Sequence, residues 1–71
     1  MMYWIKFYEE GVFVTVIGQP HYSINDAQMM LVVMADKMYS AGFSVNFPDD
    51  KSFTYDRYGT LCTLKIEEDN Q

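Results

Sequence analysis

A single stretch of this chain has helical periodicity, and segments with the alternating pattern of β-strands flank it on both sides. Residues 24–40 space their apolar side chains three and four apart, which is typical of an amphipathic helix. Two alternating segments precede this stretch and three follow it. A lone helix buries its apolar stripe by packing against one face of a sheet. We therefore predict an α+β fold: a two-layer sandwich in the order ββαβββ, with one helix packed on a mainly antiparallel five-stranded sheet.

The predicted strands are short runs rich in β-branched and aromatic residues. The turn at residues 9–11 is short, so the first two strands are expected to pair as an antiparallel hairpin, which residues 18–20 end. Two strand orders in the sheet, 2-1-5-4-3 and 2-1-3-4-5, are compatible with short connections. The predicted strands cover residues 3–8, 12–17, 43–47, 52–56 and 60–67.

The sequence also predicts where the helix begins and ends. Ser23 is an N-cap candidate, because its hydroxyl can accept a hydrogen bond from a free backbone amide and Asp26 favours the positive end of the helix. Gly42 tolerates the left-handed conformation in which helices often end. With a rotation of about 100° per residue, one stripe of the helix faces the core. That stripe is predicted to contain Ala27, Met30, Leu31, Met34 and Met38.

The length and charge of the chain limit its number of domains and the partners that it can bind. With 71 residues, the chain allows one domain, 1–71, of which we expect residues 67–71 to form a polar, flexible tail. Ten Asp and Glu residues against five Lys and Arg residues give a net charge of −5, and the basic residues are scattered. Direct binding to nucleic acid requires clustered basic residues, so we do not expect it.

No targeting or membrane segment is recognisable in the sequence. It lacks an apolar run of about 18 residues, and residues 1–10 lack the basic and continuous apolar parts of a signal peptide. Cys62 is the only cysteine, which excludes an internal disulfide. We therefore expect a cytoplasmic protein without membrane contact.

The sequence contains little that is equipped for catalysis. His21 and Cys62 are the candidates for a base and a nucleophile, and no orienting group is visible beside them. Cys62 lies in an apolar alternation, where a buried, inert thiol is the usual state. One His and one Cys do not supply a structural zinc site, and no phosphate-binding glycine loop is present. We predict no enzyme activity, no metal and no cofactor; a small enzyme that uses His21 or Cys62 is the alternative.

The helix carries more apolar surface than one sheet covers. Relative to Ala27, Met29 lies at about 200°, Val33 at about 240° and Val32 at about 140°, on the side away from the core. One alternative is that these residues are merely exposed, because isolated exposed apolar residues are common. A second alternative is that a loop or the tail covers them. The functional interpretation is a contact surface for another protein or for a second copy of the chain.

The face of the sheet opposite the helix raises the same question. Trp4 and Tyr8 are predicted to lie there, together with some of Phe13, Ile17 and Leu61. An open sheet face rich in aromatic residues suits a partner protein. The alternatives are that Trp4 packs along the sheet, or that the rings form a platform for single-stranded RNA, which the deficit of basic residues disfavours.

Acidic residues are predicted to gather at one end of the molecule. The turn at Asp49 and Asp50, the chain end at Glu67 and Glu68, and the start of the helix share that end in an up-and-down arrangement. Acidic turns serve solubility. A negative patch that steers a basic partner surface is the functional interpretation. A hard-cation site is a third interpretation, without the ligand spacing of a calcium loop.

Together these observations predict a small, acidic, non-enzymatic protein-binding module. We expect an inhibitor that occludes a surface of another protein. On general grounds, small self-contained proteins of this kind include phage or mobile-element inhibitors of CRISPR (anti-CRISPR proteins), restriction or other nucleic-acid-handling host complexes. The alternative is a homodimeric structural or antitoxin-like assembly module. The expected partner-binding residues are Met29, Val32, Val33, Trp4, Tyr8, Asp49, Asp50, Glu67 and Glu68.

Overall fold

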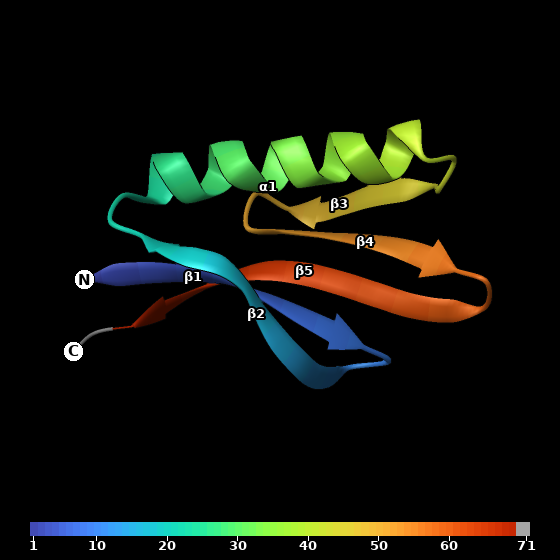
Figure 1. Ribbon diagram of the computed structural model, residues 1–71, viewed down its shortest axis with the longest axis horizontal. Helices are drawn as coiled ribbons and strands as arrows, with labels where there is room; N and C mark the ends of the chain where they lie inside the picture. Colours follow the sequence, from blue (N-terminus) through green and yellow to red (C-terminus); the bar gives the residue numbers. More distant parts are fainter. Residues whose placement is uncertain (70–71) are drawn as a thin grey trace.

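One helix packs against one face of a five-stranded sheet in the computed structural model, which describes residues 1–69 (Figure 1). All neighbouring strands are antiparallel, so the predicted α+β fold and the order of its elements are confirmed. The elements are β1 (Met2–Glu9), β2 (Val12–His21), α1 (Ile24–Ser40), β3 (Val45–Asp49), β4 (Ser52–Arg57) and β5 (Thr60–Asp69).

The sheet has the strand order β2-β1-β5-β4-β3, which is the first of the two predicted orders. The first and last strands of the chain lie side by side, with Ile5 of β1 opposite Ile66 of β5 (Figure 1). The edges of the sheet are β2 and β3, and α1 connects them. The helix therefore has to cross the face of the sheet, which is how it comes to cover the core.

Two tight hairpin turns set the register of the sheet. Glu10 and Gly11, between β1 and β2, have φ angles of 49° and 79°. Tyr58 and Gly59, between β4 and β5, have φ angles of 52° and 93°. Two consecutive left-handed residues make a turn whose twist matches that of the strands it joins. The first lies at the predicted turn over residues 9–11, and the second falls in the gap between the predicted strands 52–56 and 60–67.

The helix begins and ends at the predicted residues. The Ser23 hydroxyl accepts a hydrogen bond from the Asp26 amide at 3.1 Å, which confirms the N-cap. At the other end, the Phe43 amide donates to the Met38 carbonyl at 3.1 Å, and Gly42 has a φ of 98°. This closure uses the left-handed glycine to satisfy the last carbonyl groups. It also takes Phe43 out of β3, which begins at Val45 instead of residue 43.

Strand β2 is longer than predicted, because it continues through residues 18–20 to His21. It carries extra residues opposite the stretch of β1 between Tyr3 and Ile5, and Gly18 adopts a φ of 72° there. Such a bulge lets a strand continue past a bend. Pro20 is tolerated because the outer side of an edge strand has no backbone partner to lose.

Strand β5 is also longer than predicted, so the polar tail expected over residues 67–71 does not begin at residue 67. Glu67, Glu68 and Asp69 pair with the first residues of β1, and Asp69 lies opposite Met2. The backbone hydrogen bonds of β1 hold these acidic residues in the sheet despite their low strand propensity. The last part of the predicted tail, residues 70 and 71, lies outside the described residues.

The core lies between α1 and the sheet. Ile5, Leu31, Phe53 and Cys62 are its largest fully buried side chains. The predicted helical stripe needs one correction: Met30 is 38% exposed. Ala35 is buried in its place and is 4% exposed. The other buried or half-buried members of the predicted stripe are Ala27, Met34 and Met38.

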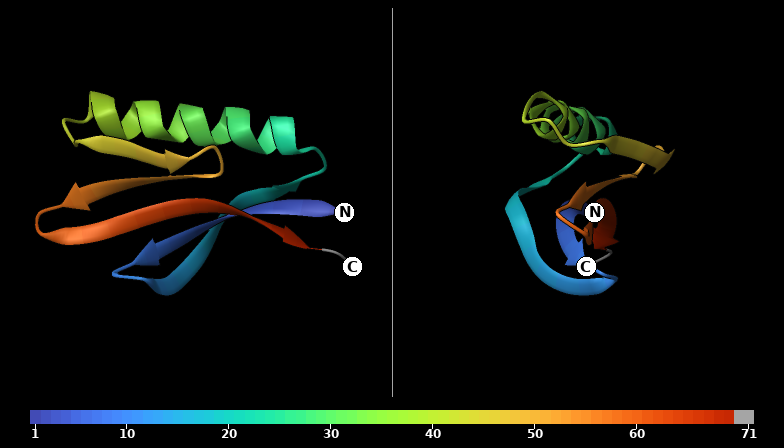
Figure 2. Two further views of the ribbon diagram at one scale, coloured as in Figure 1. Left: turned by 180° about the vertical axis from the view of Figure 1, so that it is seen from behind. Right: turned by 90° about the vertical axis from the view of Figure 1, so that its right-hand side faces the viewer.

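The sheet is strongly twisted, and the tip of the β1–β2 hairpin lies far from α1, whereas β3 lies next to the helix (Figure 2). The helix therefore has two unlike flanks, one along β3 and one toward the hairpin. A groove of about 340 Å³ lies on the hairpin side, between Met34 and Lys37 of α1 and Phe7 and Ile17 of the hairpin. Within residues 1–69, no helix is long and apolar enough to cross a membrane.

Candidate functional site

The outer face of α1 is apolar and open to solvent. Met29 is 69% exposed, Val32 58% and Val33 48%, so these three predicted residues lie on the surface. They face away from the sheet because the opposite side of α1, at Ala27 and Leu31, is buried against it. No loop or other part of residues 1–69 buries them, so the alternative in which a loop or the tail covers them does not apply to the described chain.

The apolar surface of α1 continues onto β3. Tyr39 and Phe47 are 70% and 52% exposed, and together with Val32 they flank a groove of about 270 Å³. Its remaining lining residues are Ala35, Asp36 and Val45. We call Val32, Tyr39 and Phe47 with this groove the α1–β3 surface. Sequence reasoning missed Phe47, because its alternation with Phe43 and Val45 resembles a buried face; only its position on an edge strand exposes it.

The open face of the sheet carries Trp4 and Tyr8, as predicted, but its charged residues are largely paired. Glu67 forms an ion pair with Lys6 at 3.4 Å and one with Lys65 at 3.7 Å, and it accepts a hydrogen bond from the Tyr8 hydroxyl. The ammonium group of Lys65 also lies 4.7 Å from the centre of the Tyr8 ring. We call Lys6, Tyr8, Lys65 and Glu67 the open-face network. It satisfies these side chains within the chain itself.

The protonation of this network follows from its contacts. The hydrogen bond from Tyr8, with further help from Lys6 and Lys65, holds the pKa of Glu67 below its ordinary value of 4.5. The same hydrogen bond, together with partial burial, raises the pKa of the Tyr8 phenol above 10.0. Glu67 is therefore ionised and Tyr8 neutral at neutral pH. The pair serves the sheet and is not poised to transfer a proton near pH 7.

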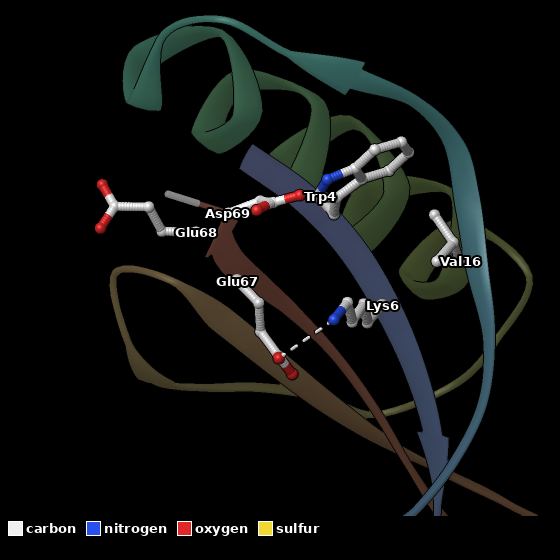
Figure 3. A pocket seen from close by; sticks show the side chains of 6 residues that line it. All are labelled: Trp4, Lys6, Val16, Glu67, Glu68 and Asp69. Atoms are coloured by element: carbon white, nitrogen blue, oxygen red, sulfur yellow. Dashed lines mark hydrogen bonds and ion pairs between the residues drawn. The ribbon is translucent and has the colours of Figure 1, made fainter. Parts of the chain in front are cut away.

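A shallow hollow of about 410 Å³ lies beside the open-face network (Figure 3). Trp4, Lys6 and Val16 line it from β1 and β2, and Glu67 and Asp69 from β5. Glu68 is at its rim and its carboxylate points away from Lys6 and Glu67 in Figure 3.

The register between β1 and β2 places Phe13 and Ile17, both candidates for the open face, on opposite faces of the sheet. Phe13 lies opposite Tyr8, with ring centres 5.8 Å apart, so it belongs to the open face. Ile17 lies opposite Ile5 and packs against the core, so it is not among the open-face residues. The extra residue in β2 between these two positions reverses the alternation, which the sequence alone does not reveal.

The β3–β4 turn with Asp49 and Asp50 lies at the same end of the sheet as Glu67 and Glu68, because the Ile66 amide donates to the Lys51 carbonyl at 2.8 Å, and two of these carboxylates also have contacts of their own. Asp49 accepts hydrogen bonds from the Lys51 amide at 2.8 Å and the Ser52 hydroxyl at 3.0 Å, which lower the pKa of its carboxyl group and fix the β3–β4 turn. Glu67 belongs to the open-face network. Glu68 and Asp50 are exposed, Glu68 at the rim of the hollow and Asp50 in the turn. Among residues 1–69, no group of three potential ligands is arranged to hold a metal ion.

His21 and Cys62 lie at opposite ends of the sheet. His21 is opposite Tyr3 on one side of β1, and Cys62 is opposite Glu9 on the other. Six residues of strand separate these positions on β1, which corresponds to roughly 20 Å. Cys62 is also fully buried. The geometry does not bring these two side chains together as a base and a nucleophile.

No protein-family model, curated protein or solved structure matches this chain. The candidate site therefore rests on the geometry of the two solvent-facing surfaces. On the open face the charged side chains pair with one another, whereas the α1–β3 surface is mainly apolar and its charged residue, Asp36, has no ion-pair partner within residues 1–69.

Proposed function

We propose that this chain is a non-enzymatic protein-binding module that docks on another protein through the α1–β3 surface. The observation that carries this proposal is the exposure of Val32, Tyr39 and Phe47 around one groove. Three large apolar side chains that converge on a hollow are typical of an interface core, where aromatic residues contribute much of the binding energy.

The charge of the surface indicates the chemistry of the partner. Asp36 lines the groove, is exposed, and has no ion-pair partner within residues 1–69. The whole chain has a net charge of −5. A partner that inserts an apolar side chain into the groove and places a Lys or Arg against Asp36 would match both features.

The edges of the sheet are less suited to binding a partner strand. β3 contains Pro48, which lacks a backbone amide, and its ladder with β4 is irregular between Asn46 and Asp49. β2 has two register shifts and contains Pro20. Proline and bulges at edges are devices that oppose strand addition. These features favour docking on side chains over pairing of backbones.

An inhibitor that occludes a basic, nucleic-acid-binding surface of a host complex is the narrower form of this proposal. Its support is the acidic charge of the chain and the single unpaired acidic residue in the groove. Its direct test is competition: the chain should displace an oligonucleotide from the partner, and raising the salt concentration should weaken the complex.

The proposal is tested by affinity capture from a bacterial lysate followed by calorimetry with the purified partner. The wild-type chain is expected to retain a stoichiometric partner with a basic surface. Val32→Lys and Phe47→Lys should each weaken that complex roughly 100-fold, because each places an ammonium group in a desolvated apolar contact. The matched control is Val33→Lys, which changes the neighbouring residue on a different side of α1.

A circular dichroism melt of each variant separates lost binding from lost folding. Val32 is 58% exposed, so Val32→Lys should melt close to the wild-type chain. Phe47→Lys should melt somewhat lower while remaining folded, because the Phe47 ring lies 5.9 Å from that of Phe53. Capture of no stoichiometric partner would refute the proposal. So would a partner that binds folded Val32→Lys and Val33→Lys equally well.

A further inference from the structure

A second stripe of α1 differs from the α1–β3 surface in both position and charge. It consists of Asp26, Met29, Met30, Val33 and Lys37, which are spaced three or four residues apart except for the adjacent Met29 and Met30, and we call it the α1 stripe. Relative to Ala27, these residues lie at about 200° to 300° around the helix. The stripe thus faces the β1–β2 side, whereas Val32 faces β3.

The α1 stripe has an apolar middle and opposite charges at its two ends. Met29, Met30 and Val33 are 69%, 38% and 48% exposed. Asp26 is exposed in the first turn of α1 and Lys37 in the last. Within residues 1–69, neither charged side chain forms an ion pair.

We propose that the α1 stripe binds a second copy of this chain, with the two α1 helices packed antiparallel about a two-fold axis. In such an interface the same surface of each copy meets the other. Asp26 of each copy then lies against Lys37 of its partner, so the two ends of the interface each hold one ion pair. The inference does not depend on the proposed function, because it uses a different side of the helix.

The same symmetry aligns the apolar residues of the stripe. Met30 of one copy lies opposite Val33 of the other at the centre of the interface. Met29 lies opposite Met34, which lines the apolar groove on the hairpin side of α1. An unbranched, flexible methionine can fill such an irregular groove. The groove thus becomes the hole into which Met29 of the second copy packs, as in the packing of ridges into grooves between helices.

Charge favours a second copy over an unrelated partner at this stripe. Two copies with a net charge of −5 each repel one another across most of their surfaces. The α1 stripe carries one negative and one positive residue, and antiparallel packing places unlike charges together at both ends. The α1–β3 surface has only Asp36 as a charged residue, so it offers two copies no such match.

Sedimentation equilibrium of the wild-type chain and five variants tests the inference. A contact made by one helix from each copy lies at the small end of interface sizes, so we expect a dimer with a Kd of roughly tens of micromolar. Val33→Lys should raise this Kd at least about 30-fold, because it places two ammonium groups near the axis. Val32→Lys is the matched control and should change the Kd less than about threefold, within the range of distant substitutions.

Charge exchange gives a second test that does not depend on the apolar residues. Asp26→Lys and Lys37→Glu should each raise the Kd about tenfold, because each converts two attractive pairs into two repulsive ones. The double variant should return to within about threefold of the wild-type Kd. Both single changes oppose the helix dipole, and the double variant retains that cost, so recovery reports the contact between copies.

Each outcome decides the inference. A wild-type chain that stays monomeric at millimolar concentration overturns it, as does a double variant that is no better than the single ones. Equal loss of dimer in Val32→Lys and Val33→Lys moves the interface to another side of α1 and also overturns it. A monomer that still captures its partner through the α1–β3 surface would remove the dimer and leave the proposed function standing.

Discussion

The molecule has two surfaces on which large apolar side chains meet water, and they are built differently. On the open face of the sheet, the rings of Trp4 and Tyr8 lie among charged residues that pair with one another around Glu67. On the outer side of α1, Met29 and Val33 are 69% and 48% exposed and have no charged network around them. The side chains of the open face therefore contact one another, whereas those on the outer side of α1 remain free to contact another protein.

This difference teaches that exposure alone does not identify a binding surface. A side chain in an internal network stabilises the fold, and docking a partner there would require breaking existing contacts. An exposed side chain without such contacts gains from burial on association, at roughly 25 cal/mol per Å² of apolar surface. The comparison therefore supports the proposed interaction role of α1 over one for the open face.

The largest expected change in stability tests whether the exposed residues of α1 contribute to the stability of the fold. Leu31→Ala should lower the free energy of unfolding by about 3 kcal/mol, because Leu31 is 1% exposed and its loss leaves a cavity. Met29→Ala, at a position 69% exposed, should change it by less than about 0.5 kcal/mol. Urea denaturation at a low chain concentration measures both. A cost for Met29→Ala close to that for Leu31→Ala would break the comparison.

A smaller effect is expected in the open-face network. Glu67→Gln should lower the free energy of unfolding by about 1 kcal/mol, because it leaves Lys6 and Lys65, which are directly opposite in the sheet, without the shared carboxylate. Asp50→Asn, in the exposed β3–β4 turn, is the matched control and should have little effect. Urea denaturation at neutral pH compares the two variants, and equal stabilities would mean that the network contributes nothing.

The contribution of Glu67 to the free energy of unfolding should depend on pH in a defined direction. The pKa of Glu67 is lowered on folding, so its contribution to stability is present above its ordinary value of 4.5 and is lost as the pH falls through the lower, folded value. The wild-type chain should therefore lose more stability below that point than Glu67→Gln does. Chemical denaturation at a series of acidic pH values measures the two curves, and parallel curves would contradict the assignment.

The smallest expected effect uses Trp4, the single tryptophan, which reports on the open face. If copies associate through α1, the emission wavelength of Trp4 should stay constant as the chain concentration rises through the monomer–dimer transition. Burial of Trp4 in an interface would exclude water and shift the emission to shorter wavelengths. Such a shift, parallel to the sedimentation data, would assign association to the open face and reverse the comparison.

Much of the fold was predictable because local signals agreed with one another. The helix from Ile24 to Ser40 has a cap at Ser23 and a glycine at residue 42, and the structure confirms both ends. The turns at residues 9–11 and 57–59 each contain a glycine where a left-handed residue is needed. The exposure of Met29, Val32 and Val33 also followed from helical geometry, since the rotation per residue fixes which side faces the sheet.

The predictions failed, or left alternatives open, where a residue's environment depends on a distant strand. The acidic residues from Glu67 to Asp69 form part of β5 because β1 supplies their backbone partners. Phe47 is exposed because β3 is an edge, although its pattern is that of a buried strand. Ile17 and Phe13 lie on opposite faces because β2 has an extra residue between them. None of these causes is local in the sequence.

The sequence by itself determined the secondary structure, the side of α1 that meets the sheet, and the excess of apolar side chains. These properties follow from backbone geometry and periodicity, which act over a few residues. Only the tertiary structure decided between the two strand orders, joined Val32 to Phe47 in one surface, and paired Glu67 with Lys6, Lys65 and Tyr8. Those outcomes depend on which strands become neighbours, and backbone pairing across the sheet settles that for the whole chain at once.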